Sequence, residues 1–97
     1  MTRLAIIIVS YNSRKDLENA LRSLTEPPPS FAHEIVVVDN ASTDSTPAYV
    51  REHWPRVRLI AAETNLGFAQ ANNVGIRNTA TELVLLVNPD TIVTAAA

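Results

Sequence analysis

The sequence predicts an α/β domain built on a parallel sheet. Three features predict it: four short segments rich in Val, Ile and Leu, a helical pattern between successive segments, and polar clusters that follow the strands. Buried parallel strands have continuous apolar sequences, and strands alternating with crossover helices form right-handed βαβ units. We therefore expect a Rossmann-like parallel sheet in the order 3-2-1-4, as in half of a doubly wound fold, with helices on both faces.

The first strand is expected over Leu4 to Ser10, where the run LAIIIVS is apolar and rich in β-branched residues. Ser13 stands three residues before Asp16, a variant of the capping box that starts a helix. The three prolines at 27–29 end this helix. Its core-facing stripe is expected to consist of Leu17, Ala20, Leu21 and Leu24.

The second strand is expected over Glu34 to Val38. Ser45 or Thr46 can cap the helix that follows, with Pro47 at its first position, where a missing N–H costs nothing. Pro55 ends it. The expected inner residues of this helix are Tyr49, Val50 and Trp54.

The C-terminal half predicts a third strand at Val57 to Ala61, a helix from about Phe68 to Asn78, and a fourth strand at Glu82 to Val87. Gly75 lies inside that helix, where glycine costs about 1 kcal/mol relative to alanine. We therefore expect the helix to approach the sheet closely at Gly75.

Composition excludes several classes of function. The 97 residues suffice for one small domain, and a net charge of −2 gives no basic face for nucleic acid. The absence of cysteine excludes disulfides, zinc–thiolate sites and thiol catalysis. No secretory signal and no apolar run of about 20 residues is present. We expect a cytoplasmic protein, with association at the cytoplasmic membrane face left open.

Polar clusters follow the strands, where ligands bind in open α/β sheets. These clusters predict one ligand site at the edge of the sheet where the carboxyl ends of the strands lie. The clusters are Ser10-Tyr11-Asn12, Asp39-Asn40, Thr64 to Gly67, and Asn88-Pro89-Asp90.

Glycine usage indicates how phosphates would be bound. The chain has 2 glycines, and neither follows the first strand, so the dinucleotide and P-loop fingerprints are absent. In place of a glycine-rich loop, a divalent cation held by a carboxylate could bind the phosphates, since Mg²⁺ usually binds through one or two carboxylates plus substrate phosphates. Asp90 is the candidate ligand; the alternative is that it only begins a turn.

Two further residues of the clusters have a functional and a structural interpretation. Asp39 could accept a pyrimidine N–H or bind ribose hydroxyls, or it could form an Asx-turn to Ser42. Tyr11 could stack on a base or pack beneath its loop. Asn12 and Ser13 suit a turn and a cap, and Asp44 suits a cap of the second helix.

Four segments together resemble family 2 glycosyltransferases of the GT-A fold, and they cover essentially the whole chain. They are IIIVSYN (Ile6 to Asn12), VVVDNASTD (Val36 to Asp44), NLGFAQANNVGI (Asn65 to Ile76) and LVLLVNPDT (Leu83 to Thr91). The NPD form of the last segment resembles the rhamnosyltransferase-like branch.

The resemblance implies a nucleotide-sugar donor, a UDP- or dTDP-sugar, bound with Mg²⁺ or Mn²⁺ for cell-wall or polysaccharide synthesis. It implies that Asp39 accepts the pyrimidine N–H, Asn88 bonds a ribose hydroxyl, and Asp90 holds the metal. The nucleotide-binding set that it implies is Ser10, Tyr11, Asn12, Asp39, Asn40, Asn65, Gly67 and Asn88.

The chain departs from the family pattern in two respects. The family's D-x-D motif has Asn88 in its first position, which removes a charge and should weaken metal binding. Members of the family continue into an acceptor-binding half that holds the general base, and no residue here matches that base. We therefore expect residues 1–97 to be the nucleotide-sugar-binding portion of such an enzyme, without an assigned catalytic residue.

Two other functions remain open at this stage. One is a non-catalytic nucleotide-binding or assembly module derived from such an enzyme. The other is a flavodoxin-like receiver, although receivers gather acidic residues after the first strand, where this chain has Ser10-Tyr11-Asn12. An unpaired fourth strand further predicts a homo-oligomer that buries Glu82 to Thr94.

Overall fold

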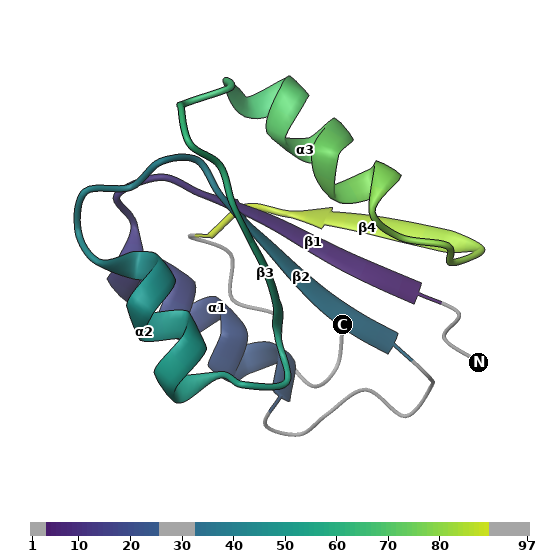
Figure 1. The fold of residues 1–97 in the computed structure, drawn as a ribbon. Coiled ribbons are helices and arrows are strands. Elements are labelled where there is room, and N and C mark those ends of the chain that lie inside the picture. The colour runs from purple at the N-terminus through teal and green to yellow at the C-terminus, as the bar shows by residue number, and fades with distance from the viewer. Residues whose placement is uncertain (1–3, 26–32, 90–97) are drawn as a thin grey trace.

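The computed structural model describes residues 4–25 and 33–89, and these form a four-stranded sheet. All strand pairs are parallel, and the order is β3-β2-β1-β4, as the sequence predicts (Figure 1). The elements are β1 (Leu4–Ser10), α1 (Arg14–Thr25), β2 (His33–Asp39), α2 (Thr46–His53), β3 (Arg58–Ala61), α3 (Phe68–Arg77) and β4 (Leu83–Val87).

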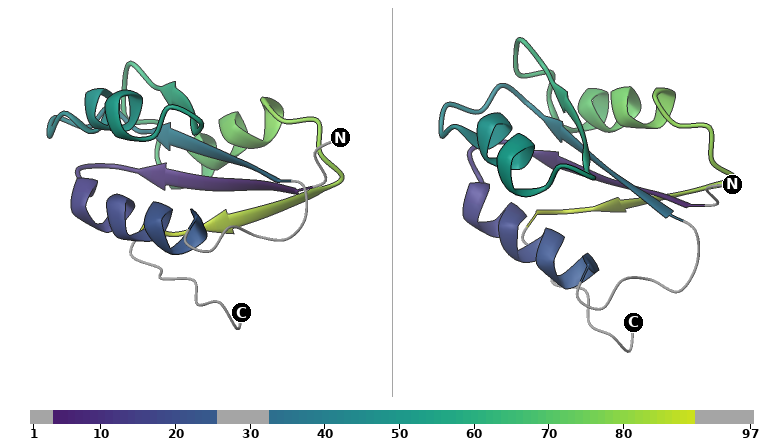
Figure 2. Two further views of the ribbon diagram at one scale, coloured as in Figure 1. Left: turned by 90° about the horizontal axis from the view of Figure 1, so that it is seen from below. Right: turned by 60° about the horizontal axis from the view of Figure 1, so that its bottom comes forward.

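Helices cover both faces of the sheet, with α1 and α2 on one side and α3 on the other (Figures 1 and 2). Successive side chains of a strand point to opposite faces, so β1 supplies both cores. Ile6 and Ile8 pack with residues of α1 and α2, while Ile7 and Val9 pack with Ala71 of α3. The continuous apolar sequence of β1 is explained by this two-sided burial.

The predicted helical stripes are confirmed with one change. Leu17, Ala20, Leu21 and Leu24 are all buried in α1. In α2, Tyr49 and Val50 are buried, but Trp54 is only partly so. The Trp54 indole packs against the same core and donates its Nε1–H to the Tyr49 hydroxyl at 3.0 Å.

Gly75 marks the close approach of α3 to the sheet, which confirms the prediction. A Cβ atom at this position would lie 2.7 Å from Cγ2 of Ile7 and 3.2 Å from Cγ2 of Val38. Helix α3 can therefore pack at this distance because residue 75 has no side chain.

The start of α2 confirms the expected cap by Asp44, but it differs from the prediction that the side chain of Ser45 or Thr46 caps it. Ser45 is the N-cap residue, but its side chain makes no capping hydrogen bond. Asp44 does so instead: its Oδ1 accepts the Thr46 N–H at 3.2 Å. The left-handed backbone at Ser45, with φ of 64°, brings the preceding Asp44 side chain over the helix end.

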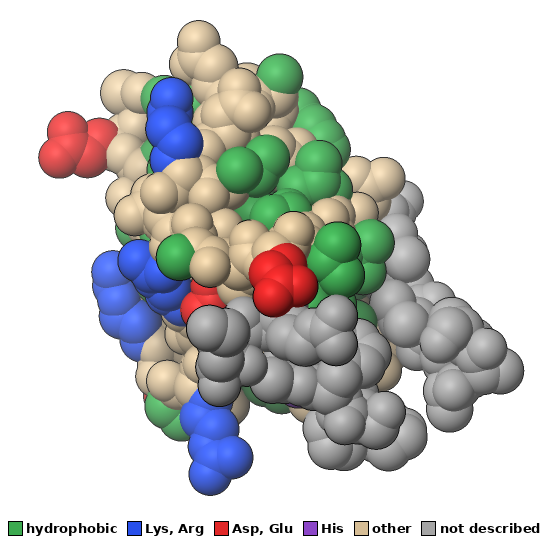
Figure 3. Space-filling view, turned by 90° about the vertical axis from the view of Figure 1, so that its right-hand side faces the viewer, with side chains coloured by type: hydrophobic (Ala, Val, Ile, Leu, Met, Phe, Trp, Pro, Cys, Tyr) green, Lys and Arg blue, Asp and Glu red, His purple; other side chains and the backbone are tan. Residues whose placement is uncertain are grey.

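The β4 edge of the sheet exposes apolar side chains. Leu83 is 57% exposed and Leu86 is 48% exposed, and Val84 and Leu85 are also exposed. Phe68 and Ile76 of α3 are exposed too, and apolar side chains gather on one side of the molecule in Figure 3. Among the helices described in 4–25 and 33–89, none has the length and apolar character needed to cross a bilayer.

Candidate functional site

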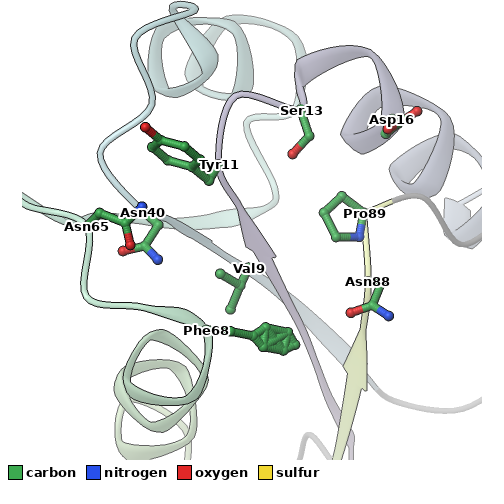
Figure 4. A pocket seen from close by; sticks show the side chains of 9 residues that line it. All are labelled: Val9, Tyr11, Ser13, Asp16, Asn40, Asn65, Phe68, Asn88 and Pro89. Atoms are coloured by element: carbon green, nitrogen blue, oxygen red, sulfur yellow. The ribbon is translucent and has the colours of Figure 1, made fainter.

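A cavity of about 480 Å³ lies at the carboxyl ends of the strands, where the polar clusters are expected to meet (Figure 4). Loops that follow β1, β2 and β3 contribute side chains, and so do the end of β4 and the first turns of α1 and α3. The lining residues are Val9, Tyr11, Ser13, Asp16, Asn40, Asn65, Phe68, Asn88 and Pro89.

Each of the four predicted polar clusters contributes to the lining, through Tyr11, Asn40, Asn65 and Asn88. Tyr11 is 49% exposed, and Figure 4 shows its ring beside the cavity on the loop after β1. This placement leaves an aromatic face available to a ligand, and it differs from the alternative in which the ring packs beneath its loop.

Asp39 has the contacts of the structural alternative. It is 1% exposed and is not part of the cavity lining. Its Oδ2 accepts the backbone N–H of Ser42 at 2.9 Å, and its Oδ1 accepts the Ser42 hydroxyl at 2.6 Å. The expected cap of the loop up to Ser42 is therefore present, with a bond to the backbone three residues on rather than the two of an Asx-turn, and each carboxylate oxygen keeps a further lone pair.

Ser10 and Asn12 connect loops in this structure. Ser10 is fully buried, its carbonyl accepts the Asn40 N–H at 2.7 Å, and it does not line the cavity. Asn12 has a left-handed backbone with φ of 48°, and its Oδ1 accepts the Thr43 N–H at 2.8 Å. The sequence interpretation of Asn12 as a turn residue matches these contacts.

Asn40 joins the loop after β2 to the loop before α3. Its buried side chain accepts the Leu66 N–H at 2.6 Å and donates to the Gly67 carbonyl at 3.3 Å. Asn65 closes the same loop by accepting the Gly67 N–H at 2.8 Å. Gly67 has φ of 79° and ψ of 164°, a conformation that is essentially restricted to glycine.

Asn88 lies at the end of β4 with its side chain exposed to the cavity. Asp90, the expected metal ligand, lies outside the described residues. Within residues 4–25 and 33–89, no group of three or more His, Cys, Asp or Glu side chains could hold a metal.

Phe68 and Asp16 line the cavity without having been assigned to it from the sequence. Phe68 is 53% exposed in the first turn of α3, and Asp16 lies in the first turn of α1. In a parallel βαβ unit the N-terminus of the crossover helix lies at the carboxyl edge of the sheet. First-turn residues with large or charged side chains were the signal that could have identified them.

This chain is similar to known proteins in both sequence and structure. A family model described as glycosyl transferase family 2 matches residues 5–96. Poly(ribitol-phosphate) beta-N-acetylglucosaminyltransferase TarS of Staphylococcus aureus is 34% identical over 94 residues, 93% of this chain and 16% of that protein. N-acetylglucosaminyl-diphospho-decaprenol L-rhamnosyltransferase of Mycobacterium tuberculosis is 38% identical over 73 residues, 72% of this chain and 22% of that protein.

Solved structures show the same fold. A crystal structure of TarS residues 1–349 superposes with a TM-score of 0.84 and 31% identity, covering 96% of this chain and 29% of that one. Mannosyltransferase PcManGT from Pyrobaculum calidifontis, in complex with GDP-Man and Mn²⁺, has a TM-score of 0.77 and 34% identity. That match covers 91% of this chain and 27% of the mannosyltransferase.

This chain spans less than a third of the length of these relatives. The region matched by the family model nevertheless includes every residue that lines the cavity and all four strands except Leu4, the first residue of β1. The GT-A-type parallel sheet expected from the sequence is found in these solved relatives. The chain belongs to glycosyl transferase family 2.

Proposed function

We propose that residues 1–97 form the nucleotide-sugar-binding portion of a glycosyltransferase that transfers a sugar from a nucleoside diphosphate to an acceptor hydroxyl. One observation carries the proposal: the half-exposed Tyr11 ring and the amides of Asn40, Asn65 and Asn88 line one cavity at the carboxyl edge of the sheet. An aromatic face with a few convergent polar groups suits a base and its ribose.

A uridine or thymidine donor suits the aromatic ring, the carboxylate and the amide found in or beside the cavity. Tyr11 would stack on the base, and the Asp39 carboxylate would accept the ring N–H with a lone pair that Ser42 does not use. Asn88 would bond a ribose hydroxyl from the opposite side of the cavity (Figure 4). TarS has been solved with UDP and with UDP-GlcNAc, which supports a uridine nucleotide.

A divalent cation, Mg²⁺ or Mn²⁺, would be held by Asp90 together with the diphosphate. Such a site needs no carboxylate cluster, because Mg²⁺ commonly binds one or two carboxylates and completes its shell with phosphate oxygens and water. The complex of PcManGT with GDP-Man and Mn²⁺ supports it. When bound, the cation stabilises the negative charge on the departing nucleoside diphosphate.

The test is a calorimetric titration of the chain with UDP, dTDP, GDP and ADP, each with Mn²⁺ and with a chelator. UDP or dTDP should bind, with an affinity that Mn²⁺ increases. Ligand at 100 times its Kd should also raise the free energy of unfolding by about 2.7 kcal/mol. Tyr11→Ala should weaken binding, whereas Ser45→Ala, an exposed serine without a capping bond, should not.

If no nucleotide binds or stabilises the chain, the donor-binding proposal is wrong, and the assembly module without catalysis becomes the better hypothesis. Equal binding of all four nucleotides would keep a nucleotide site but contradict the assignment of Asp39 to a pyrimidine N–H.

Self-association through β4 is a further part of the proposal. Strand β4 is an edge strand whose Leu83 to Leu86 segment is apolar and exposed, and edges of this kind favour pairing. We expect the isolated chain to form a homo-oligomer that buries this segment. Leu85→Lys should yield a monomer in sedimentation velocity, and a monomeric unsubstituted chain at high concentration would contradict the expectation.

A role in cell-wall or polysaccharide synthesis, at the cytoplasmic face of a membrane, is the cellular setting that we propose. It is supported by similar proteins whose names specify poly(ribitol phosphate), a decaprenol diphosphate and succinoglycan. Fractionation should find the protein in the cytosol or peripherally on membranes and released by salt. Recovery in a secreted fraction would contradict this setting.

A further inference from the structure

A single hydroxyl connects the buried carboxylate beside the proposed site to the loop that carries Tyr11. The Ser42 Oγ donates to Asp39 Oδ1 at 2.6 Å and accepts the backbone N–H of Asn12 at 2.9 Å. A serine hydroxyl has one donor and two acceptor lone pairs, so both contacts can form at once with fixed directions. The Asn12 amide, next to Tyr11 in the chain, is thereby tied to a carboxylate on another strand.

The Asp39 end of this connection is rigid. Asp39 is 1% exposed, pairs in register with Ser10 at the end of β1, and also accepts the Ser42 N–H at 2.9 Å. A buried carboxylate with both oxygens engaged holds Ser42 in one orientation. The Asp39–Ser42 pair is therefore a fixed support on the central strands.

The Asn12 end determines where Tyr11 lies. Asn12 has φ of 48°, in the left-handed region that asparagine adopts more readily than most residues other than glycine. Its N–H bonds to Ser42 and its Oδ1 bonds to the Thr43 N–H at 2.8 Å, so both its backbone and its side chain are held by the loop after β2. These bonds fix the backbone direction immediately after Tyr11, whose ring stands beside the cavity (Figure 4).

We propose that Ser42 is a positioning residue, which holds the Tyr11 ring for base stacking by connecting the Asp39 carboxylate to the Asn12 backbone. This inference rests on the proposed nucleotide site. Ser42 does not line the cavity, so the proposed effect on binding passes through the Asn12 backbone to Tyr11. The affinity contributed by Tyr11 then depends on the Ser42 hydroxyl.

A double-mutant cycle with UDP tests the connection. Ser42→Ala should weaken UDP binding about threefold to tenfold, the range expected for one net hydrogen bond. In the Tyr11→Ala background the same substitution should have a much smaller effect, because residues that act as a unit are not additive. Ser42→Thr keeps the hydroxyl and should bind nearly as the unsubstituted chain does.

Ser45→Ala is the matched control, because it removes a serine hydroxyl from the same loop where no capping bond is lost. Binding is measured well below the unfolding temperature of each variant. Equal weakening by Ser42→Ala with and without Tyr11, or no weakening at all, would overturn the positioning role.

A measurement without ligand separates this inference from the proposed function. Amide hydrogen exchange at Asn12 should become about tenfold faster in Ser42→Ala. The Leu17 amide, bonded to the Ser13 carbonyl at 2.9 Å, should exchange as before. Unchanged exchange at Asn12 would overturn the connection even if UDP binds. Failure of the unsubstituted chain to bind UDP would instead refute the nucleotide site.

Discussion

The Asp44 carboxylate accepts a hydrogen bond from the backbone N–H of Arg14, 30 residues earlier, at 3.2 Å. Its other oxygen accepts the Thr46 N–H at 3.2 Å and also bonds the Thr46 hydroxyl. Arg14 begins α1 and Thr46 begins α2, so one side chain caps two helices. The first N–H groups of a helix have no partner within it, and a negative charge there also interacts favourably with the helix dipole.

Asp44→Ala should lower the free energy of unfolding by about 1–2 kcal/mol, the range for loss of a strong helix cap. Asp44→Asn should cost less, because an amide oxygen can still accept from one N–H. Urea denaturation followed by circular dichroism measures both. Glu52→Ala, an exposed substitution in α2, is the control and should change stability by no more than about 0.5 kcal/mol.

Acid should remove the contribution of Asp44 to stability. Burial acts to raise the pKa of Asp44, but hydrogen bonds from Thr46 and Arg14 outweigh burial and hold the pKa below its usual 3.8. A carboxyl whose pKa is lowered by folding stabilises the protein above its unfolded pKa and loses that effect as pH falls through the folded value. The stability difference between the unsubstituted chain and Asp44→Asn should therefore be constant near neutrality and shrink below about pH 4. A difference that grows in acid would refute this linkage.

Asn40 should matter both to stability and to nucleotide binding. Asn40→Ala would leave the Leu66 N–H and the Gly67 carbonyl without the partner that they have now, at a cost of about 1–3 kcal/mol. The loop that carries Asn65 should then loosen and UDP affinity should fall. Asn73→Ala, on the exposed side of α3, is the control for helix effects. Retained stability in Asn40→Ala would show that the bridge between the loops is dispensable.

Substitution by alanine should destabilise the protein at both glycines, for different reasons. At Gly75 an alanine gains about 1 kcal/mol of helix propensity, but its Cβ would lie 2.7 Å from Ile7 Cγ2, and overpacking typically costs about 1–3 kcal/mol. Gly67 has no atom near its virtual Cβ, and its positive φ is the obstacle. Gly75→Ala should therefore be rescued in part by Ile7→Ala, whereas Gly67→Ala should not. Thermal denaturation of the single and double variants measures the rescue. If Ile7→Ala restored stability equally to Gly75→Ala and Gly67→Ala, the steric explanation for Gly75 would be contradicted.

Asp39 and Asp90 should have separable effects on nucleotide binding. Asp39→Ala should weaken UDP or dTDP binding about equally with and without Mn²⁺, by about 1.5–3 kcal/mol for a charge-assisted hydrogen bond. Asp90→Ala should abolish the increment due to metal and leave metal-free binding nearly unchanged. Calorimetry of each variant, with metal and with chelator, gives the four affinities required.

Because Asp39 also supports Ser42, Ser42→Ala serves as the control that breaks this support while keeping the carboxylate. If Asp39→Ala weakens binding no more than Ser42→Ala does, Asp39 acts only through the Tyr11 loop. Loss of the same metal-dependent increment in both aspartate variants would show that their roles are not separate.

Local sequence patterns determined most of the fold. The apolar run of β1 and the stripe from Leu17 to Leu24 specify what each element buries, and burial is the main favourable contribution to folding. Gly75 indicated the close approach of α3, and Asp44 indicated the cap of α2, because a glycine inside a helix and an aspartate just before one are visible in the local sequence. The contact of the same Asp44 with Arg14 of α1, 30 residues away, is not. Strands that alternate with helices then leave few topologies, of which 3-2-1-4 is observed.

The tertiary structure decided which polar side chains reach the cavity. Ser10 and Asp39 are the last residues of β1 and β2, at the edge where a ligand site is expected, yet the register pairs them side by side and they are buried, at 0% and 1% exposure. Phe68 and Asp16 reach the cavity because their helices begin at the same edge of the sheet. Asn40 bonds residues 26 and 27 positions away, and Asn12 bonds Thr43 across 31 positions. Such bonds depend on the relative placement of loops from different strands, and no periodicity within one segment encodes that placement.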